Sequence, residues 1–365
     1  MMAASRSNAT ARDTVRAMFS AEPRGSRWKR RAKTIPAMLC VTAGAVVMLP
    51  VIVVSAAVAD LLRLRLKFPT VRIALFLVQY AVNDSVEILL AGPLALVAGF
   101  GRGLRQPASI RRHERVQAWS LDVLARRAER LLGLRVEVDQ SSLDALVPGP
   151  VIVLCRHVNL VDASLPSLLY QRLGMRTRGA IMGELLADPG FDLIYGRTGS
   201  VFIPRDNTVE ARRLVHHLAN GVDDGTAVVI FPEGRLFRPE VLCRALVRLE
   251  ATNPQRFARL SEIRHVLPPR PGGVLALLDA LPGVDIVVLA HTGLDQFASF
   301  RELARSVPLV GPIRCTAWRI PFADVPAEPE PRIQWLDEQW LTIERHVRSV
   351  ASPGDSRATT SLAPG

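Results

Sequence analysis

A histidine and an aspartate separated by four residues follow an apolar run in this chain. The run is Val151–Cys155, and His157 and Asp162 come after it. Around a continuous helix these two residues would lie about 140° apart, so they could meet only across a loop that leaves a strand. Imidazole can take a proton from a hydroxyl near neutral pH, while a carboxylate on its other nitrogen fixes the tautomer. The pair is typical of a general base and its orienting carboxylate. Since the chain has seven His residues, a chance pair in a solvated loop is the alternative.

Two later segments have the same form, a short apolar run that ends in charged or turn residues. Residues 199–205 read GSVFIPR, and residues 229–234 read VIFPEG. Arg205 could hold a phosphate through bidentate, charge-assisted hydrogen bonds, or it could cap a surface loop against Asp206. Glu233 cannot attract a phosphate, so we expect it to orient an arginine or to accept a bond from a substrate hydroxyl.

Together with His157 and Asp162, these segments resemble the glycerolipid acyltransferase family, which includes 1-acylglycerol-3-phosphate and lysophospholipid acyltransferases. The family pattern is an Asn-His-x4-Asp block, a Gly-x-x-Phe-Ile-x-Arg block, a Phe-Pro-Glu-Gly-Thr-Arg-Ser block and a later Val-Pro-like block. Residues 265–273, HVLPPRPGG, look like the fourth block. The resemblance covers roughly residues 130–290. It implies transfer of a fatty acyl chain to the hydroxyl of glycerol phosphate or a lysophospholipid.

The chain departs from this pattern at three places. Arg156 replaces the Asn before the His, Asn159 replaces the Ser usually found two residues after it, and residues 235–237 are Arg-Leu-Phe instead of Thr-Arg-Ser. The third departure puts the acceptor contacts in question, although Arg235 and Arg238 bracket the position of the family's arginine. Either one could still deliver a guanidinium to an acceptor phosphate.

The resemblance implies a catalytic pair and a substrate-binding set. The catalytic pair is His157 and Asp162, and the substrate-binding set is Gly199, Phe202, Arg205, Phe231, Pro232, Glu233, Gly234, Arg235 and Arg238. No metal or prosthetic group is expected, because the acyl-CoA or acyl carrier protein thioester that serves as co-substrate is already activated. The other histidines singled out lack a carboxylate at matching spacing and are interpreted as helix-surface or core residues: His216, His217, His265 and His291.

The catalytic region alternates between apolar runs of strand length and segments with helical spacing. The expected strands are 151–155, 179–182, 201–203, 227–231 and 286–290, and the expected helices are 163–173, 208–219, 240–250 and 274–281. This alternation predicts an α/β layered domain with a mostly buried sheet flanked by helices.

Membrane helices are expected before that domain. Residues 34–59 carry no charge, and at about 1.5 Å per residue they exceed the roughly 30 Å hydrocarbon core of a bilayer. A second apolar stretch, residues 73–100, contains Asp84 and Glu87, which in a membrane segment would face protein or water. Basic residues flank both stretches, so a re-entrant hairpin competes with two full spans. The expected division is 1–33 basic disordered arm, 34–100 membrane anchor, 101–350 acyltransferase domain and 351–365 disordered tail.

The net charge of +12 suggests anionic partners. Aromatic residues are only 5% of the chain and no nucleic-acid module is recognisable, so an anionic phospholipid membrane is favoured over nucleic acid. The four cysteines show no Cys-x-x-Cys spacing and indicate neither zinc nor a disulfide framework. This cysteine pattern fits a catalytic domain that faces the cytoplasm. Cys155 is expected to be a buried structural thiol and not a nucleophile.

The sequence therefore predicts a membrane-bound acyltransferase in which His157 deprotonates the free hydroxyl of lysophosphatidate or another lysophospholipid. Two alternatives stay open at this point. One is a catalytically silent membrane scaffold with the same fold, and the other is a hydrolase that passes the acyl chain to water.

Overall fold

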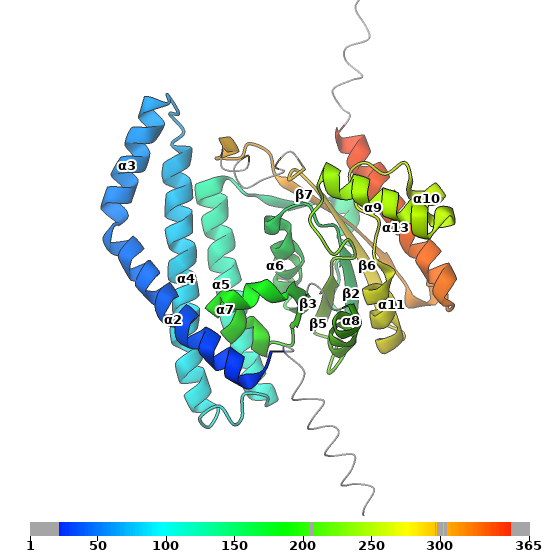
Figure 1. The fold of residues 1–365 in the computed structure, drawn as a ribbon, viewed down its shortest axis with the longest axis horizontal. Coiled ribbons are helices and arrows are strands. Elements are labelled where there is room, and N and C mark those ends of the chain that lie inside the picture. The colour runs from blue at the N-terminus through cyan, green and yellow to red at the C-terminus, as the bar shows by residue number, and fades with distance from the viewer. Residues whose placement is uncertain (1–21, 205–207, 296, 298–301, 303–304, 352–365) are drawn as a thin grey trace, which may run out of the picture.

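The computed structural model describes residues 22–204, 208–295, 297, 302 and 305–351. Four long helices come first, and an α/β domain follows them and lies to their side (Figure 1). The four helices are α2 (Arg24–Val47), α3 (Leu49–Leu62), α4 (Pro69–Val97) and α5 (Pro107–Leu132).

The α/β domain is built on a seven-stranded sheet with the order β1-β7-β6-β2-β5-β3-β4. All neighbouring strands are parallel except β6 and β7. The strands are β1 (Val136–Val138), β2 (Val151–Cys155), β3 (Arg176–Met182), β4 (Val201–Ile203), β5 (Thr226–Ile230), β6 (Asp285–Thr292) and β7 (Ile313–Ile320). This mixed, helix-flanked sheet confirms the predicted α/β class.

Helices cover both faces of the sheet (Figure 1). They are α6 (Leu165–Arg172), α7 (Pro189–Leu193), α8 (Thr208–His217), α9 (Pro239–Thr252), α10 (Pro254–Leu260), α11 (Pro271–Ala280) and α13 (Pro329–Ala351). Short 3-10 turns lie between them: η1 (Gln140–Ser142), η2 (Leu160–Ser164), η3 (Gly183–Ala187), η4 (Tyr195–Arg197) and η5 (Phe322–Asp324).

Strand β2 shows why its sequence is apolar throughout. Alternate side chains of a strand point to opposite faces, and both faces here are covered. Ile152 and Leu154 pack into a core with α8, α11 and α13, while Val151 and Val153 pack into a second core with α6. Every β2 residue is buried, so the strand and the loop that follows it have a fixed position.

The stretch predicted as a single uncharged span, residues 34–59, is not one continuous helix. It is divided between α2 and α3, which are bent by 65° at the break. Pro50 lies at the start of α3, and its ring nitrogen cannot donate the next hydrogen bond of the α2 ladder. Among the described residues one helix, α4, has by itself the length and hydropathy of a membrane span, and α2 with α3 pass that test only together.

The second apolar stretch is more regular than the sequence predicted, since α4 runs through Pro93 without a break. Its two carboxylates face protein, as expected for charged groups in such a helix. Asp84 Oδ1 accepts a hydrogen bond of 2.9 Å from the Gly190 backbone nitrogen, and Glu87 accepts one from Ser120 of α5. A side chain at residue 190 would collide with Asp84, so Gly190 allows α7 to lie directly against α4.

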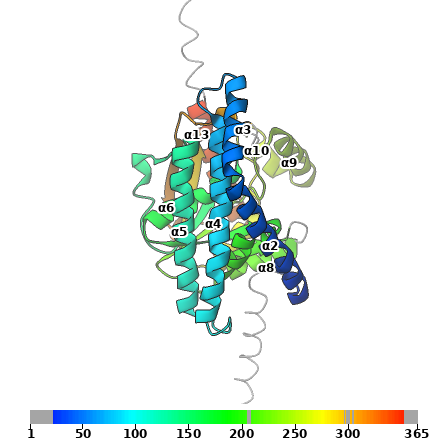
Figure 2. The same cartoon turned by 90° about the vertical axis from the view of Figure 1, so that its left-hand side faces the viewer.

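Two of the N-terminal basic residues, Arg30 and Arg31, form ion pairs within the protein. Arg31 makes a bidentate pair with Asp192 of α7, at 2.7 Å for both bonds, and Arg30 reaches the same carboxylate at 2.9 Å. The α2 helix is thereby fastened to α7, and Figure 2 shows it crossing in front of α4. Both guanidiniums therefore bind one buried carboxylate of the protein.

Candidate active site

The site forms where β2 and β5 end side by side. The two strands are parallel, with Leu154 opposite Ile230, so the loops that follow them meet at the same edge of the sheet. His157 comes from the first loop, and Phe231 and Glu233 come from the second. The two rings of His157 and Phe231 are in contact, with centroids 4.5 Å apart.

The loop after β2 brings His157 and Asp162 together. Asn159 is in extended conformation and caps η2, and this reversal turns Asp162 back toward the strand end. The distance between His157 Nδ1 and Asp162 Oδ1 is 2.6 Å. Asp162 Oδ2 accepts bonds from the backbone nitrogens of Val158, at 2.5 Å, and Asn159, at 2.7 Å. The carboxylate is therefore fixed by its own loop before it meets the imidazole.

Asp162 is fully buried, yet its environment favours the ionised form. Burial by itself would raise the pKa of this carboxyl, but hydrogen bonds from His157 and His291 and the electrostatic attraction of these two side chains outweigh burial and hold the pKa well below its ordinary value. Asp162 therefore stays a carboxylate at neutral pH, as an orienting group for an imidazole must.

A second histidine, His291 at the end of β6, completes the surroundings of Asp162. Its Nε2 lies 3.4 Å from Asp162 Oδ2 and 3.2 Å from the carbonyl oxygen of Arg156. A carbonyl only accepts, so Nε2 carries the proton and donates. His291 was interpreted from its spacing as a helix-surface or core residue. It is fully buried, and its carboxylate partner comes from another segment, because β6 lies beside β2 in the sheet although it is far from it in sequence.

Asp162 binds Nδ1 of His157, so Nε2 is the nitrogen left for a substrate. No described residue bonds Nε2, and the His157 side chain is 13% exposed while Asp162 is inaccessible. The ring also lies against Phe231, and the His157 carbonyl accepts a 2.9 Å bond from the Phe237 nitrogen. This geometry is that of an imidazole held at one nitrogen and open at the other.

Glu233 links the loop after β5 to two other loops. Its Oε1 accepts from the His157 backbone nitrogen and its Oε2 from the Leu267 nitrogen, both at 3.1 Å. The residue is 2% exposed, and burial raises its pKa to about 7 despite the nearby charge of Arg156 and the hydrogen bonds from the backbone nitrogens of His157 and Leu267. Both oxygens are occupied by the protein, so the structure places Glu233 as a clamp on the backbone of His157. The sequence had suggested a contact with an arginine or a substrate hydroxyl.

Arg156, at the position of the family's Asn, is a buried residue that binds three other segments of the chain. Its side chain is 1% exposed and donates 2.8 Å and 2.6 Å bonds to the carbonyl oxygens of His291 and His265, and it also pairs with Asp295. The guanidinium thus joins the ends of β2 and β6 to the loop before α11. Sequence inspection noted the substitution but gave no sign of this function.

The remaining predicted residues are distributed unevenly around this centre. Phe202 is 2% exposed on β4, which β3 separates from β5, so it is a core side chain and not a surface for substrate. Gly199 has a φ of +91° and lies against Arg178. Arg205 lies outside the described residues. Pro232 is buried, and its carbonyl oxygen accepts a 2.8 Å bond from the Arg270 nitrogen.

Arg235 and Arg238, which the sequence could not distinguish, have different surroundings. Arg238 donates to two carbonyl oxygens, those of Val158 at 3.3 Å and Phe237 at 2.7 Å. Arg235 is exposed beside Gly234. The structure therefore uses Arg238 to brace the His157 loop, and Arg235 is the one that faces outward.

Cys155 agrees with its predicted structural role. It is fully buried, and burial raises the pKa of its thiol well above the ordinary value, so a thiolate nucleophile is disfavoured. Among the described residues, no three His, Cys, Asp or Glu side chains are grouped as metal ligands.

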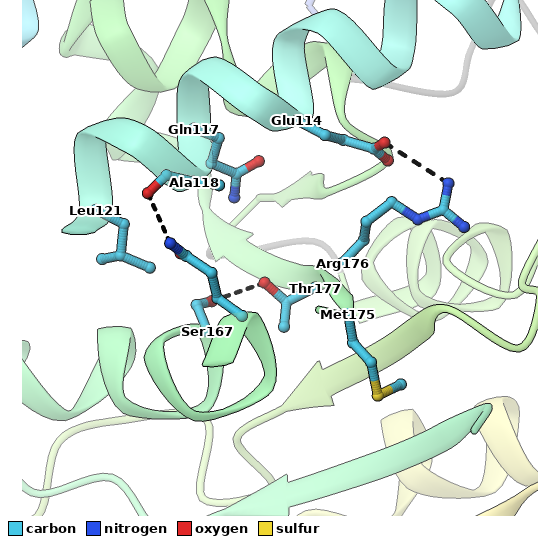
Figure 3. A pocket seen from close by; sticks show the side chains of 9 residues that line it. Glu114, Gln117, Ala118, Leu121, Ser167, Met175, Arg176 and Thr177 are labelled. Carbon is cyan, nitrogen blue, oxygen red and sulfur yellow. Dashed lines mark hydrogen bonds and ion pairs between the residues drawn. The ribbon is translucent and has the colours of Figure 1, made fainter. Parts of the chain in front are cut away.

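A small cavity of about 50 Å³ lies elsewhere, between α5, α6 and the start of β3 (Figure 3). Its rim includes the Arg176–Glu114 ion pair and the 2.9 Å bond between Thr177 and Ser167. This volume is of the size of one or two waters, so the cavity does not compete with the loops after β2 and β5 as a substrate site.

An α/β domain with a carboxylate-oriented histidine at the end of its central strand defines a class of group-transfer or hydrolytic enzyme. Residues 135–291 match the family model described as Acyltransferase. This segment is therefore similar to acyltransferase domains, in agreement with the resemblance of its sequence blocks. A search of curated proteins found no match. Among solved structures, the chain is similar to the 1-acyl-sn-glycerophosphate (LPA) acyltransferase PlsC from Thermotoga maritima. The identity is 16%, the alignment covers 75% of this chain and 98% of the other, and the TM-score is 0.45.

Proposed function

We propose that this protein transfers a fatty acyl chain from an acyl thioester to the free hydroxyl of lysophosphatidate or another lysophospholipid. The observation that carries the proposal is the 2.6 Å contact between His157 Nδ1 and the buried carboxylate of Asp162, which leaves Nε2 as the open nitrogen. The match of residues 135–291 to acyltransferases supplies the reaction class.

In the proposed reaction the acceptor hydroxyl donates its proton to Nε2 of neutral His157 as its oxygen attacks the thioester carbonyl. A carbon–oxygen bond forms, the carbon–sulfur bond breaks, and the proton passes from His157 to the departing thiolate. Asp162 stays ionised throughout and stabilises the transient imidazolium. The products are the acylated phospholipid and a free thiol, with coenzyme A or acyl carrier protein as the carrier. The step is complete without a prosthetic group.

Glu233 and Arg156 act as positioning residues in this proposal. Glu233 holds the backbone nitrogen of His157, and Arg156 holds the carbonyl of His291, the second histidine at Asp162. Because His157 lies in the loop between β2 and η2, these two buried side chains help to fix where the imidazole lies.

The proposal also includes attachment to a membrane, with residues 34–100 as the anchor, 101–350 as the catalytic domain and the catalytic domain in the cytoplasm. Its support is the apolar surface of α3 and α4. Exposed on this surface are Val51, Val54, Val58, Leu61, Leu62, Leu77, Leu89 and Leu96. Side chains of this kind are costly in water and favourable in lipid. The basic flanks, Arg30 and Arg31 excepted, suit anionic headgroups.

The test is an acyl-transfer assay on the purified full-length protein in detergent micelles. It is offered a panel of lysophospholipids with labelled acyl-CoA or labelled acyl carrier protein, and His157→Ala protein is the control. Labelled diacyl product that depends on His157 is expected with at least one acceptor. Release of labelled fatty acid at the same rate with and without acceptors would identify a hydrolase instead. Absence of both products across the panel would favour the silent scaffold.

A further inference from the structure

We propose that Glu344 of α13 is a positioning residue for the candidate base, and that it acts through His265 in the loop before α11. This inference rests on the proposed function, because it assigns a role in the transfer step to a second pair of imidazole and carboxylate. The two residues are 79 positions apart in the chain. From its spacing His265 was interpreted as a helix-surface or core residue, and Glu344 was not among the candidate site residues.

Glu344 holds His265 at two points. Its Oε2 accepts a 2.7 Å bond from the His265 backbone nitrogen, and its Oε1 lies 2.9 Å from His265 Nδ1. Burial by itself would raise the pKa of Glu344, but hydrogen bonds from the side chain and backbone of His265 and from the Arg264 backbone nitrogen outweigh burial and lower it. Glu344 is therefore an ionised acceptor at neutral pH, so Nδ1 carries the proton and His265 donates both bonds.

The loop that contains His265 is also tied to the candidate active site. The His265 carbonyl oxygen accepts a 2.6 Å bond from Arg156 Nη2, and Arg156 directly precedes the base His157. Two residues further along the loop, the Leu267 nitrogen donates to Glu233 Oε2. Glu233 Oε1 accepts from the His157 nitrogen, and both bonds are 3.1 Å long. This short loop therefore reaches the base by two separate routes.

The α13 helix gives this loop a rigid point of attachment. Residues 261–267 form no helix or strand, so contacts with other segments must fix their position. In contrast, α13 is a helix of 23 residues, and its inner face is buried in the domain core through Trp335, Trp340 and Ile343. Figure 1 shows α13 on the side of the domain away from α2 to α4. Glu344 thus connects the base to a part of the fold that packing holds in place.

The chemistry of the pair indicates positioning more than packing. Glu344 is 3% exposed, and an ionised carboxylate is costly to bury unless hydrogen bonds satisfy it. An apolar side chain of the same size would fill the space without this cost, but it could not orient the loop through two bonds of fixed direction. His265 Nε2 bonds no described residue, and the His265 side chain is 32% exposed. The donor at Nδ1 is therefore the part of the imidazole that the fold uses.

The first experiment measures steady-state kinetics of the full-length protein in detergent micelles. Glutamine at residue 344 would present an amide donor where His265 needs an acceptor, so the loop should lose its attachment. Glu344→Gln should lower kcat roughly ten- to a hundredfold, since a displacement of about 1 Å at a reacting group can cost this much. The apparent KM for both substrates should change by less than about threefold, because Glu344 lies outside the candidate substrate-binding set.

Three further variants separate positioning from a general loss of stability. His265→Asn keeps a side-chain N–H close to the place of Nδ1 and should retain most of kcat, whereas His265→Ala should lose as much as Glu344→Gln. The matched control is Gln339→Ala, which removes the 2.9 Å bond between α13 and Trp318 of β7 and should leave kcat unchanged. Equal losses in His265→Asn and His265→Ala, or a loss in Gln339→Ala as large as in Glu344→Gln, would overturn the proposal.

The second experiment needs no turnover and follows hydrogen–deuterium exchange by mass spectrometry. Glu344→Gln should speed exchange in the peptides that contain His157 and Leu267, whose amides both donate to Glu233, and Gln339→Ala should not. Unchanged exchange in Glu344→Gln protein contradicts the link to the base even where acyl transfer is observed. Faster exchange in a protein that transfers no acyl chain would support the link and count against the proposed function alone.

Discussion

Asp162 presents one carboxylate oxygen to His157 and the other to His291, at 2.6 Å and 3.4 Å from the ring nitrogens. The two histidines come from the ends of neighbouring parallel strands, β2 and β6. His157 is partly exposed and has an open nitrogen, whereas His291 is fully buried. One imidazole is therefore placed to meet a substrate, and the other is placed to hold the carboxylate that orients the first.

His157→Ala protein should lose acyl transfer while it stays folded, because the open Nε2 is the proposed proton acceptor. Asp162→Asn should lower kcat by orders of magnitude, since an amide neither enforces the tautomer nor balances the imidazolium. The measurement is transfer of labelled acyl chain, with circular dichroism as the check on folding. Near-normal turnover by folded His157→Ala protein would rule out the proposed mechanism.

The His291→Phe substitution should raise the pH at which the protein begins to unfold in acid, which is the acid limb of its stability profile. The folded pKa of Asp162 is depressed, so the stability it contributes is complete above its ordinary pKa of about 4 and is lost as the pH falls below that value. Loss of the His291 hydrogen bond makes this depression smaller, so acid unfolding should begin at a higher pH. At neutral pH the cost should be about 1–3 kcal/mol, because two buried acceptors lose a donor.

The readout is unfolding followed by tryptophan fluorescence between pH 3 and pH 7. His216→Phe on the exposed face of α8 is the matched control and should leave both the midpoint and the acid limb in place. An acid limb that does not move in His291→Phe would mean that the 3.4 Å contact contributes nothing to the ionisation of Asp162.

Glu233 should make the protein less stable as the pH rises from 5 to 8. Its folded pKa of about 7 is above the ordinary value of 4.5, so the folded state binds the proton more tightly than the unfolded state. Stability linked to this group is complete below pH 4.5, declines through the interval and is lost above pH 7. The decline should be on the order of 2–4 kcal/mol.

Glu233→Gln protein cannot titrate at this position and should show a flatter dependence over the same pH range, whatever its absolute stability. The comparison of the two slopes isolates Glu233 from histidines that titrate in the same interval. Equal slopes would mean that the buried carboxyl keeps its ordinary pKa.

Arg156→Ala should destabilise the domain by about 3–5 kcal/mol, because two carbonyl oxygens and Asp295 lose a buried guanidinium. Arg156→Asn, which restores the family's residue, should rescue little of this, since the shorter side chain cannot reach three acceptors. Chemical unfolding in detergent measures both variants. Arg264→Ala, whose side chain bonds only to carbonyls of its own turn, is the control and should cost less than about 0.5 kcal/mol.

The full-length chain should resist extraction from membranes by alkaline carbonate, and deletion of residues 1–62 should weaken this attachment without abolishing it, because α4 is retained. Deletion also removes Arg30 and Arg31 from Asp192, so Arg30→Ala/Arg31→Ala is the control that loses docking and keeps the apolar helices. That control should remain in the carbonate pellet. Recovery of the full-length chain in the supernatant would identify α2 to α4 as helices of a soluble protein.

Local sequence predicted the elements whose patterns are complete within a few residues. The run Val151–Cys155 forms β2 with the expected bounds, because a strand covered on both faces must be apolar throughout. The segment 201–203 forms β4, and α8, α9 and α11 each lie within a few residues of the expected helices. The pairing of His157 with Asp162 was also readable, since four intervening residues can close only as a loop. In the N-terminal region, periodicity and charge showed apolar helices but not the 65° bend between α2 and α3.

The tertiary structure decided the contacts between segments that are distant in the chain. His291 reaches Asp162 because β6 lies beside β2. Glu233 holds His157 because β5 lies beside β2 on its other edge. Arg156 joins the ends of β2 and β6. Arg270 lies over Gly234 because the loop before α11 pairs with Pro232. Spacing along the chain determines only which nearby residues can meet. The order of the strands determines which distant charged side chains share a buried, low-dielectric environment, and therefore which hydrogen-bond or ion-pair partners these side chains must have.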